Sequence, residues 1–222
     1  MAQDLTISII CEGPTDDIVL RNVITSFTGN KDILFTTLQP RPGDDGNWDK
    51  VLKYCASDDF KGSFANPDNY VVIQIDTDFL IGDSCPEQFR IPLIDQMEPI
   101  PVLDEMRKHL INQMGQAHFD LFSSRIIFAI AVAQLECWFL AIYYPDNKKK
   151  AGKVVSCIDN LNAPLFQAEK FYIDAKDLGH YRTICRHFKK KADLLKYSTP
   201  NDSFRAFVNE LDTKIPKEPV AE

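Results

Sequence analysis

The stretch ISIICEGPTDD (residues 7–17) begins as an apolar, β-branched strand and leads through a Gly-Pro turn into a helix. A second apolar run, YVVIQI (residues 70–75), ends in the same way on Asp76-Thr77-Asp78. Strands this apolar are typical of the middle of a parallel sheet, where ligands bind outside the carboxyl ends of the strands. We therefore expect Glu12, Asp76 and Asp78 to converge at one edge of such a sheet.

Strand-like and helix-like patterns alternate over the first two thirds of the chain. Strands are predicted at residues 5–11, 33–38, 70–75 and 125–132, and helices at residues 15–27, 48–55, 102–119 and 135–144, with Thr15 as the N-cap of the first helix. This alternation predicts an α/β fold with a doubly wound, mainly parallel sheet over residues 1–145. After Pro145 the composition changes, and residues 146–222 are expected to form a helical extension packed on that domain.

The amino-acid composition excludes several classes of protein. The chain has 222 residues, 45% of them hydrophobic, which suffices for one good core. Its formal charge of −7 argues against a general nucleic-acid coat protein. The apolar stretch at residues 126–144 is interrupted by polar residues, so no membrane association is expected. Six cysteines without a Cys-x-x-Cys spacing predict reduced thiols, a cytoplasmic protein and no zinc site.

Five acidic residues follow predicted strands or begin predicted helices. Oxygen ligands select hard cations, so Mg²⁺ or Mn²⁺ is the expected cofactor. Two such ions can stabilise the attacking and leaving oxygens of a phosphodiester displacement. The expected metal ligands are Glu12, Asp16, Asp76, Asp78 and Glu136. A cation from the extension, Lys176 or one of residues 189–191 with Lys189 first, would stabilise charge on the phosphate.

Structural interpretations of the same residues stay open at this point. Asp16 suits the positive end of a helix dipole, and Asp76 and Asp78 are common turn residues after a strand. Glu136, within an apolar helix, would be stabilised by a buried salt bridge to an arginine such as Arg125. The lysine runs are compatible with solvated helix faces.

An apolar strand into Glu-Gly-x-x-Asp, followed by a second strand into Asp-x-Asp, resembles the Toprim domain of topoisomerases, primases and OLD-type nucleases. The resemblance implies that Glu12 takes part in acid/base chemistry or binds metal and that Asp76 and Asp78 bind a divalent metal. It also implies that Asp16 helps to bind a second metal ion. QLECWFLA (residues 134–141), which contains Glu136, is similar to a signature of small, stand-alone Toprim-like proteins of phage defence.

The function expected from these features is a divalent-metal-dependent phosphodiesterase, a nuclease acting on DNA or RNA, in phage defence as the resemblance implies. One alternative is a non-catalytic Toprim-fold effector, or a partner-binding protein of a defence or toxin-antitoxin system. A haloacid-dehalogenase-type phosphatase fits poorly, because that family carries Asp-x-Asp after its first strand, where this chain has Glu12-Gly13. The sequence leaves open whether a larger partner, such as an ATPase, controls the activity.

Overall fold

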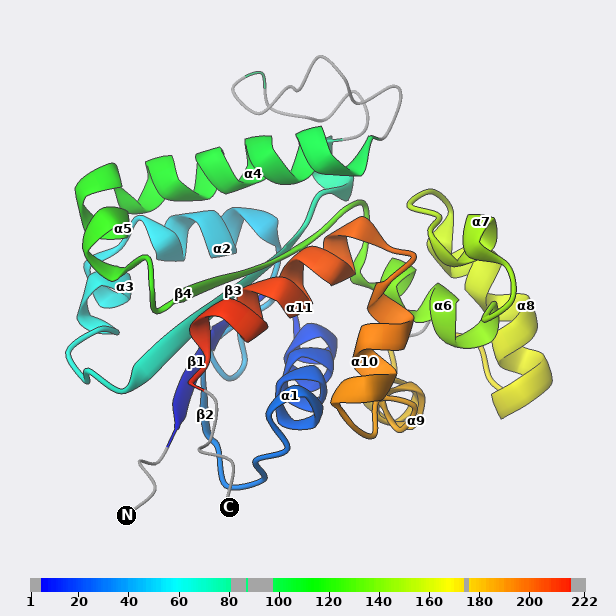
Figure 1. Ribbon diagram of the computed structural model, residues 1–222. Coiled ribbons are helices and arrows are strands. Elements are labelled where there is room, and N and C mark those ends of the chain that lie inside the picture. Colours follow the sequence, from blue (N-terminus) through cyan, green and yellow to red (C-terminus); the bar gives the residue numbers. More distant parts are fainter. Residues whose placement is uncertain (1–4, 81–86, 88–97, 174–175, 217–222) are drawn as a thin grey trace.

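A parallel sheet forms the centre of the protein. The computed structural model describes residues 5–80, 87, 98–173 and 176–216. Within these residues, four parallel strands form one sheet in the order β2-β1-β3-β4 (Figure 1). The strands are β1 (Thr6–Ile10), β2 (Leu34–Gln39), β3 (Asn69–Asp76) and β4 (Ile126–Ala131). The doubly wound α/β fold expected from the sequence is confirmed.

The strand order places β1 beside β3. β1 pairs with β2 on one side and with β3 on the other, in a register that sets Ile10 opposite Ile73. The chain therefore leaves β1 in one direction to build β2 and later returns to the other side of β1 to build β3. Such a reversal is the switch point at which open α/β sheets hold ligands, and here it lies between the carboxyl ends of β1 and β3.

Helices cover both faces of the sheet (Figure 1). One face carries α2 (Trp48–Cys55), α3 (Asp58–Gly62), α4 (Pro99–Met114) and α5 (Gln116–Phe122). The other face carries α1 (Pro14–Thr28), α9 (Leu178–Cys185), α10 (Lys191–Ser198) and α11 (Asp202–Lys214). Because successive strand residues point to opposite faces, Ile9 packs into the core under α1 while Ile10 packs into the core under α4.

The helices after residue 146 share the core of the sheet domain. α7 (Lys148–Ala151) and α8 (Cys157–Glu169) lie beside α6 (Leu140–Tyr143), while α11 runs along β4 (Figure 1). Trp138 is fully buried and stacks on Phe204 and Phe207 of α11. β4 is an edge strand, and the Lys214 ammonium donates a hydrogen bond of 2.5 Å to the Ile126 carbonyl on that edge. α11 therefore covers an edge that could otherwise pair with another chain.

Several predicted helices differ from the observed ones. Gly13, not Thr15, is the N-cap of α1, because Pro14 supplies the fixed φ that favours the first helical position. The helix expected at residues 102–119 is two helices that meet at Gly115, whose φ of 85° interrupts the helical backbone. Residues 135–144 form a 3₁₀ helix, η4 (Leu135–Phe139), followed by the short α6. No helix of the described ranges is both long and apolar enough to cross a membrane.

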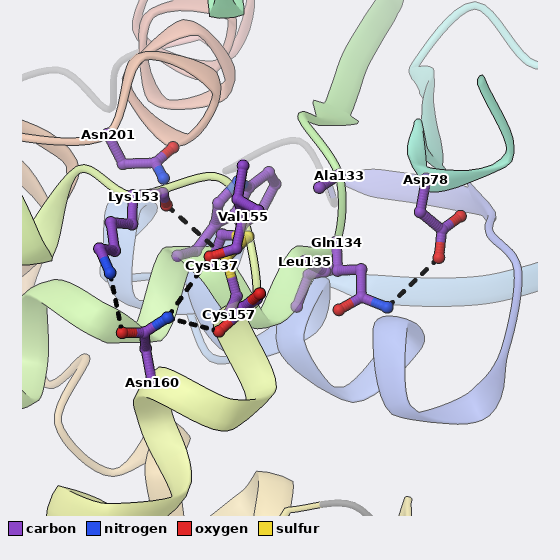
Figure 2. The surroundings of a disulfide bond; sticks show 12 residues. Asp78, Ala133, Gln134, Leu135, Cys137, Lys153, Val155, Cys157, Asn160 and Asn201 are labelled. Atoms are coloured by element: carbon purple, nitrogen blue, oxygen red, sulfur yellow. Dashed lines mark hydrogen bonds between the residues drawn. A yellow bond between two sulfur atoms is a disulfide. The ribbon is translucent and has the colours of Figure 1, made fainter. Parts of the chain in front are cut away.

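The prediction that all the cysteines are reduced thiols is wrong for one pair. η4 brings Cys137 next to the start of α8, where it forms a disulfide with Cys157 (Figure 2). Their Cα atoms are 5.0 Å apart, within the range that a disulfide bridges. The proximity depends on tertiary packing across 20 positions of sequence, which residue spacing does not reveal. Cys11, Cys55 and Cys185 are free and buried, while Cys85 lies outside the described residues.

Replacing Trp138 by Ala is expected to lower the free energy of unfolding by about 3–5 kcal/mol, because it leaves a cavity between η4 and α11. The exposed Leu121, truncated as Leu121→Ala, should change stability by less than about 0.5 kcal/mol. Urea unfolding followed by circular dichroism measures both. A loss below about 1 kcal/mol for Trp138→Ala would contradict the shared core.

Candidate metal centre

Glu12 and Asp76 meet at the switch point of the sheet. Glu12 follows β1 and Asp76 is the last residue of β3. The Asp76 N–H donates a hydrogen bond of 2.7 Å to the Glu12 Oε1 atom. The two acids that the sequence placed at neighbouring strand ends are therefore in direct contact.

A buried glutamine fixes the orientation of both acids. The Gln74 side chain is fully buried; its Oε1 accepts from the Glu12 N–H at 3.1 Å, and its Nε2 donates to Asp76 Oδ1 at 2.8 Å. The Leu135 N–H donates to the same Asp76 oxygen at 3.1 Å. These hydrogen bonds hold Oδ1, so Oδ2 is the Asp76 atom best placed to bind a ligand. Sequence reasoning missed Gln74, although it is a polar residue in an apolar strand.

Asp16 joins the same cluster from the first turn of α1. Asp16 is buried, with 8% of the residue exposed, and its carboxylate interacts electrostatically with Glu12, Asp76 and Glu136. Backbone N–H groups at Gly13 and Asp16 bond its carboxylate, as expected where a helix begins. Its neighbour Asp17 instead pairs with Arg21 at 2.7 Å. The two consecutive aspartates therefore have different environments, and Asp16 is the one that belongs to the cluster.

Glu136 is buried and is held by a tyrosine of the extension. The Tyr181 hydroxyl of α9 donates a hydrogen bond to Glu136 Oε1. The predicted alternative, a salt bridge to Arg125, is wrong, because the Arg125 guanidinium bonds the carbonyls of Asn66 and Phe64. Arg125 precedes β4 whereas Glu136 follows it, so the length of the strand separates them. No pattern in the sequence pointed to Tyr181.

Asp78 lies at the exposed rim of the cluster. Gln134 donates a side-chain hydrogen bond of 3.3 Å to Asp78 Oδ2 (Figure 2). Two hydrogen bonds fix the backbone beneath it, from the Asp78 N–H to the Ala133 carbonyl at 3.0 Å and from the Ala133 N–H to Thr77 Oγ1 at 2.9 Å. The segment after β4 thus holds the Asp-x-Asp turn in place.

Burial and mutual repulsion raise the pKa values of three of these carboxyls. Burial, with the charges of Asp16 and Asp78 adding to it, raises the pKa of Glu12 from 4.5 to about 8. Burial and the charge of Glu136 raise the pKa of Asp16 from 3.8 to about 7. Burial and the surrounding acids raise the pKa of Asp76 well above its ordinary value. At neutral pH the cluster therefore retains protons unless a cation compensates its charge.

The two predicted lysines have different positions. Lys176 is exposed and close enough to Glu12 and Asp16 for its positive charge to lower the pKa of both. Lys189 is also exposed, but it follows Phe188, whose carbonyl accepts a hydrogen bond from Ser26 near the far end of α1. Ten helical residues separate Ser26 from Asp16, or about 15 Å. The structure thus brings Lys176 to the acids and leaves Lys189 away from them.

A glycine allows the loop after β2 to lie against the Glu12 backbone. A Cβ atom built on Gly46 would be 1.5 Å from the Glu12 carbonyl oxygen, which no side chain can occupy. The loop before α2 therefore passes directly over the residue that begins the cluster. The sequence showed a Gly-rich loop at this point but gave no sign of where it would pack.

Two observations test whether these residues fit a divalent cation. The donor set fits, because Glu12, Asp16, Asp76, Asp78 and Glu136 offer the carboxylate oxygens that Mg²⁺ and Mn²⁺ prefer. The spacing is wider than a bound ion needs: in the part of the chain that the structure describes, no three acidic, histidine or cysteine side chains already lie at metal-binding distances. A cation would have to draw the side chains closer. The residues fit the group by the chemistry of their oxygen donors.

Asp16→Asn is expected to stabilise the metal-free protein increasingly as the pH rises. In the folded protein the Asp16 carboxyl keeps its proton up to about pH 7, whereas in the unfolded chain it loses the proton near pH 4. Between these two pH values the folded chain therefore binds more protons than the unfolded chain. The contribution of the Asp16 carboxyl to stability therefore falls between about pH 4 and pH 7. The gain from Asp16→Asn should be near zero at pH 4 and on the order of 4 kcal/mol at pH 9.

Urea unfolding in EDTA across this pH range measures the gain. Asp17→Asn is the matched control, because the Asp17 carboxylate lies outside the cluster, where it pairs with Arg21 and accepts a hydrogen bond of 2.8 Å from the Thr37 hydroxyl. The Arg21 pair is worth less than about 1 kcal/mol. A constant difference between Asp16→Asn and the parent at all pH values would show that Asp16 is not crowded by other acids.

Comparison of the chain with protein-family models, with curated proteins and with solved structures gives no match. Proposals about function therefore rest on the geometry and chemistry of the acidic cluster.

Proposed function

We propose that the protein is a Mg²⁺- or Mn²⁺-dependent phosphodiesterase that cleaves DNA or RNA at the acidic cluster. The observation that carries the proposal is the contact between the Glu12 carboxylate and the Asp76 N–H, around which Asp16, Asp78 and Glu136 gather. Carboxylates from three separate segments are costly to gather at one place, above all where they are buried, as Asp16 and Glu136 are. A divalent cation bound among these carboxylates would offset their mutual repulsion.

The resident metal would be held by the carboxylates at the ends of β1 and β3, with Glu12, Asp76 and Asp78 first. Asp16 and Glu136 lie deeper and would serve a second ion. When bound, divalent metal supplies charge stabilisation for an in-line displacement at phosphorus and lowers the pKa of water. Asp78, which is exposed, marks the side from which a phosphodiester would approach.

Protein side chains complete the proposed chemistry. Glu12 would bind the metal ion or accept a proton, because its carboxylate lies at the switch point beside the Asp76 N–H. Lys176 is the cation nearest to these acids that the sequence proposed, and its ammonium would stabilise negative charge on the phosphate. Tyr181 holds Glu136 and acts as a positioning residue.

Glu12→Gln and Asp76→Asn are each expected to reduce Mn²⁺-dependent cleavage at least about 100-fold, because each removes a charged ligand or proton acceptor at the reacting centre. Cleavage of single- and double-stranded DNA and of RNA, with and without EDTA, measures the effect. Asp17→Asn, one residue from Asp16 but paired with Arg21, should stay within about 3-fold of the parent. Circular dichroism and thermal melting check that each variant is folded.

Parent-like cleavage by both Glu12→Gln and Asp76→Asn would refute the proposal. If the parent binds Mn²⁺ but cleaves none of these substrates, the site is non-catalytic. The alternative of a Toprim-fold effector or partner-binding protein would then be favoured.

A further inference from the structure

A hollow lined by charged and hydroxyl-bearing residues lies at the opposite end of the sheet from the acidic cluster. It has a volume of about 410 Å³ and is lined by residues that include Arg107, Arg125 and Lys214. Tyr70 also lines it, at the amino end of β3, six residues before Asp76. At about 3.3 Å per strand residue, the hollow is roughly 20 Å from the acids. The two sites are therefore separate.

The hollow is rich in positive charge, although the whole chain is acidic. Three cationic side chains line it, and two of them share the Glu210 carboxylate, which accepts from Arg107 at 2.6 Å and from Lys214 at 2.6 Å. Among the described residues, Asp68 also acts on Tyr70 at the hollow. Two negative charges against three positive charges leave an excess of one. For a protein of net charge −7, such an excess in one hollow is a local reversal of sign.

The three cations are held in place before any ligand arrives. Arg107 and Lys214 both lie over the ring of Phe128, at 4.7 and 5.9 Å from its centroid. Arg125 bonds the Asn66 carbonyl at 2.8 Å and lies 5.0 Å from the centroid of the Phe122 ring. Ordered cations lose little conformational entropy when they bind an anion.

Donors remain for a ligand after these contacts are counted. An arginine has five N–H donors and a lysine has three. Arg107 bonds Glu210 through one nitrogen, Nη1, and Arg125 bonds main-chain carbonyls through its two terminal nitrogens. Ser124 and Tyr70 line the same hollow and carry hydroxyl groups as uncharged donors, whereas the hydroxyl of Thr213, which also lines it, donates to the Asn209 carbonyl at 2.8 Å. Cations forked around a cavity with hydroxyls at its wall match a phosphate, whose oxygens accept several hydrogen bonds.

We propose that this hollow binds the phosphate group of a small phosphorylated ligand, such as a nucleoside monophosphate. Its volume falls in the range of small-molecule sites, about 300–1,000 Å³. A track for a nucleic-acid strand would need a longer basic surface, and the net charge of −7 opposes one. The proposal does not rest on the function assigned to the acidic cluster.

Isothermal titration calorimetry in EDTA and low salt tests the proposal, because EDTA removes any cation that could hold phosphate at the acidic cluster. The probes are inorganic phosphate and adenosine 5′-monophosphate. Arg107→Gln and Lys214→Gln should each weaken binding of both probes at least about 10-fold, since each removes a charge-assisted donor. Lys108→Gln is the matched control, because Lys108 is the next residue of α4 but pairs with Glu105.

A second variant keeps the ion pairs intact. Ser124 is exposed at the wall of the hollow, and Ser124→Asp introduces a negative charge there without removing a cation. It should abolish binding of both probes while thermal melting stays unchanged. Asp76→Asn, at the other site, should bind them as the parent does.

Three results would overturn the proposal. They are no measurable binding of either probe, equal binding by the parent and Ser124→Asp, or loss of binding in Lys108→Gln to the same extent as in Arg107→Gln. Tighter binding of a single-stranded oligonucleotide than of adenosine 5′-monophosphate, weakened by the same variants, would assign the hollow to nucleic acid instead. Failure of nuclease activity would leave the outcome of this experiment unaffected.

Discussion

The hydrogen bond from the Asp76 N–H to the Glu12 carboxylate joins the ends of the two central strands. It depends on the strand order, because only β1 beside β3 brings these residues together. The other parts of the cluster fit around that bond. Gln74 bridges the same two residues from below, and the loop at Gly46 closes over the Glu12 main chain. The sheet topology is thus the constraint from which the candidate centre follows.

The extension supplies part of what stabilises the acidic cluster. Two ionised carboxylates about 5 Å apart repel by roughly 3 kcal/mol at an effective dielectric constant near 20. A cluster of five acids therefore needs hydrogen-bond donors and positive charge from elsewhere in the chain. The extension provides both, since Tyr181 bonds Glu136 and Lys176 lowers the pKa of Glu12 and Asp16. The acids come from the first 145 residues, and part of what stabilises them comes from the remainder.

The sequence predicted the features that depend on local pattern and general topology. Apolar strands that end in acids indicate the parallel sheet, and because ligands bind outside the carboxyl ends of such strands, Glu12 and Asp76 are expected at the same edge. Features set by long-range packing were missed, because nothing near them in sequence signals their partners. The Cys137–Cys157 disulfide and the contact of Tyr181 with Glu136 are of this kind. Lys189 was chosen for its charge alone, and the fold directs it to the other end of α1.

The position of α11 along β4 has a consequence for synthesis of the chain. β4 is complete at Ala131, whereas the helix that covers its outer edge ends at Lys214, 83 residues later. At about 5–20 residues per second, a ribosome needs roughly 4–17 s to add that segment. During this interval the nascent sheet has a bare edge strand, which is a template for pairing with neighbouring chains. Chaperone binding to the growing polypeptide would matter most in that interval.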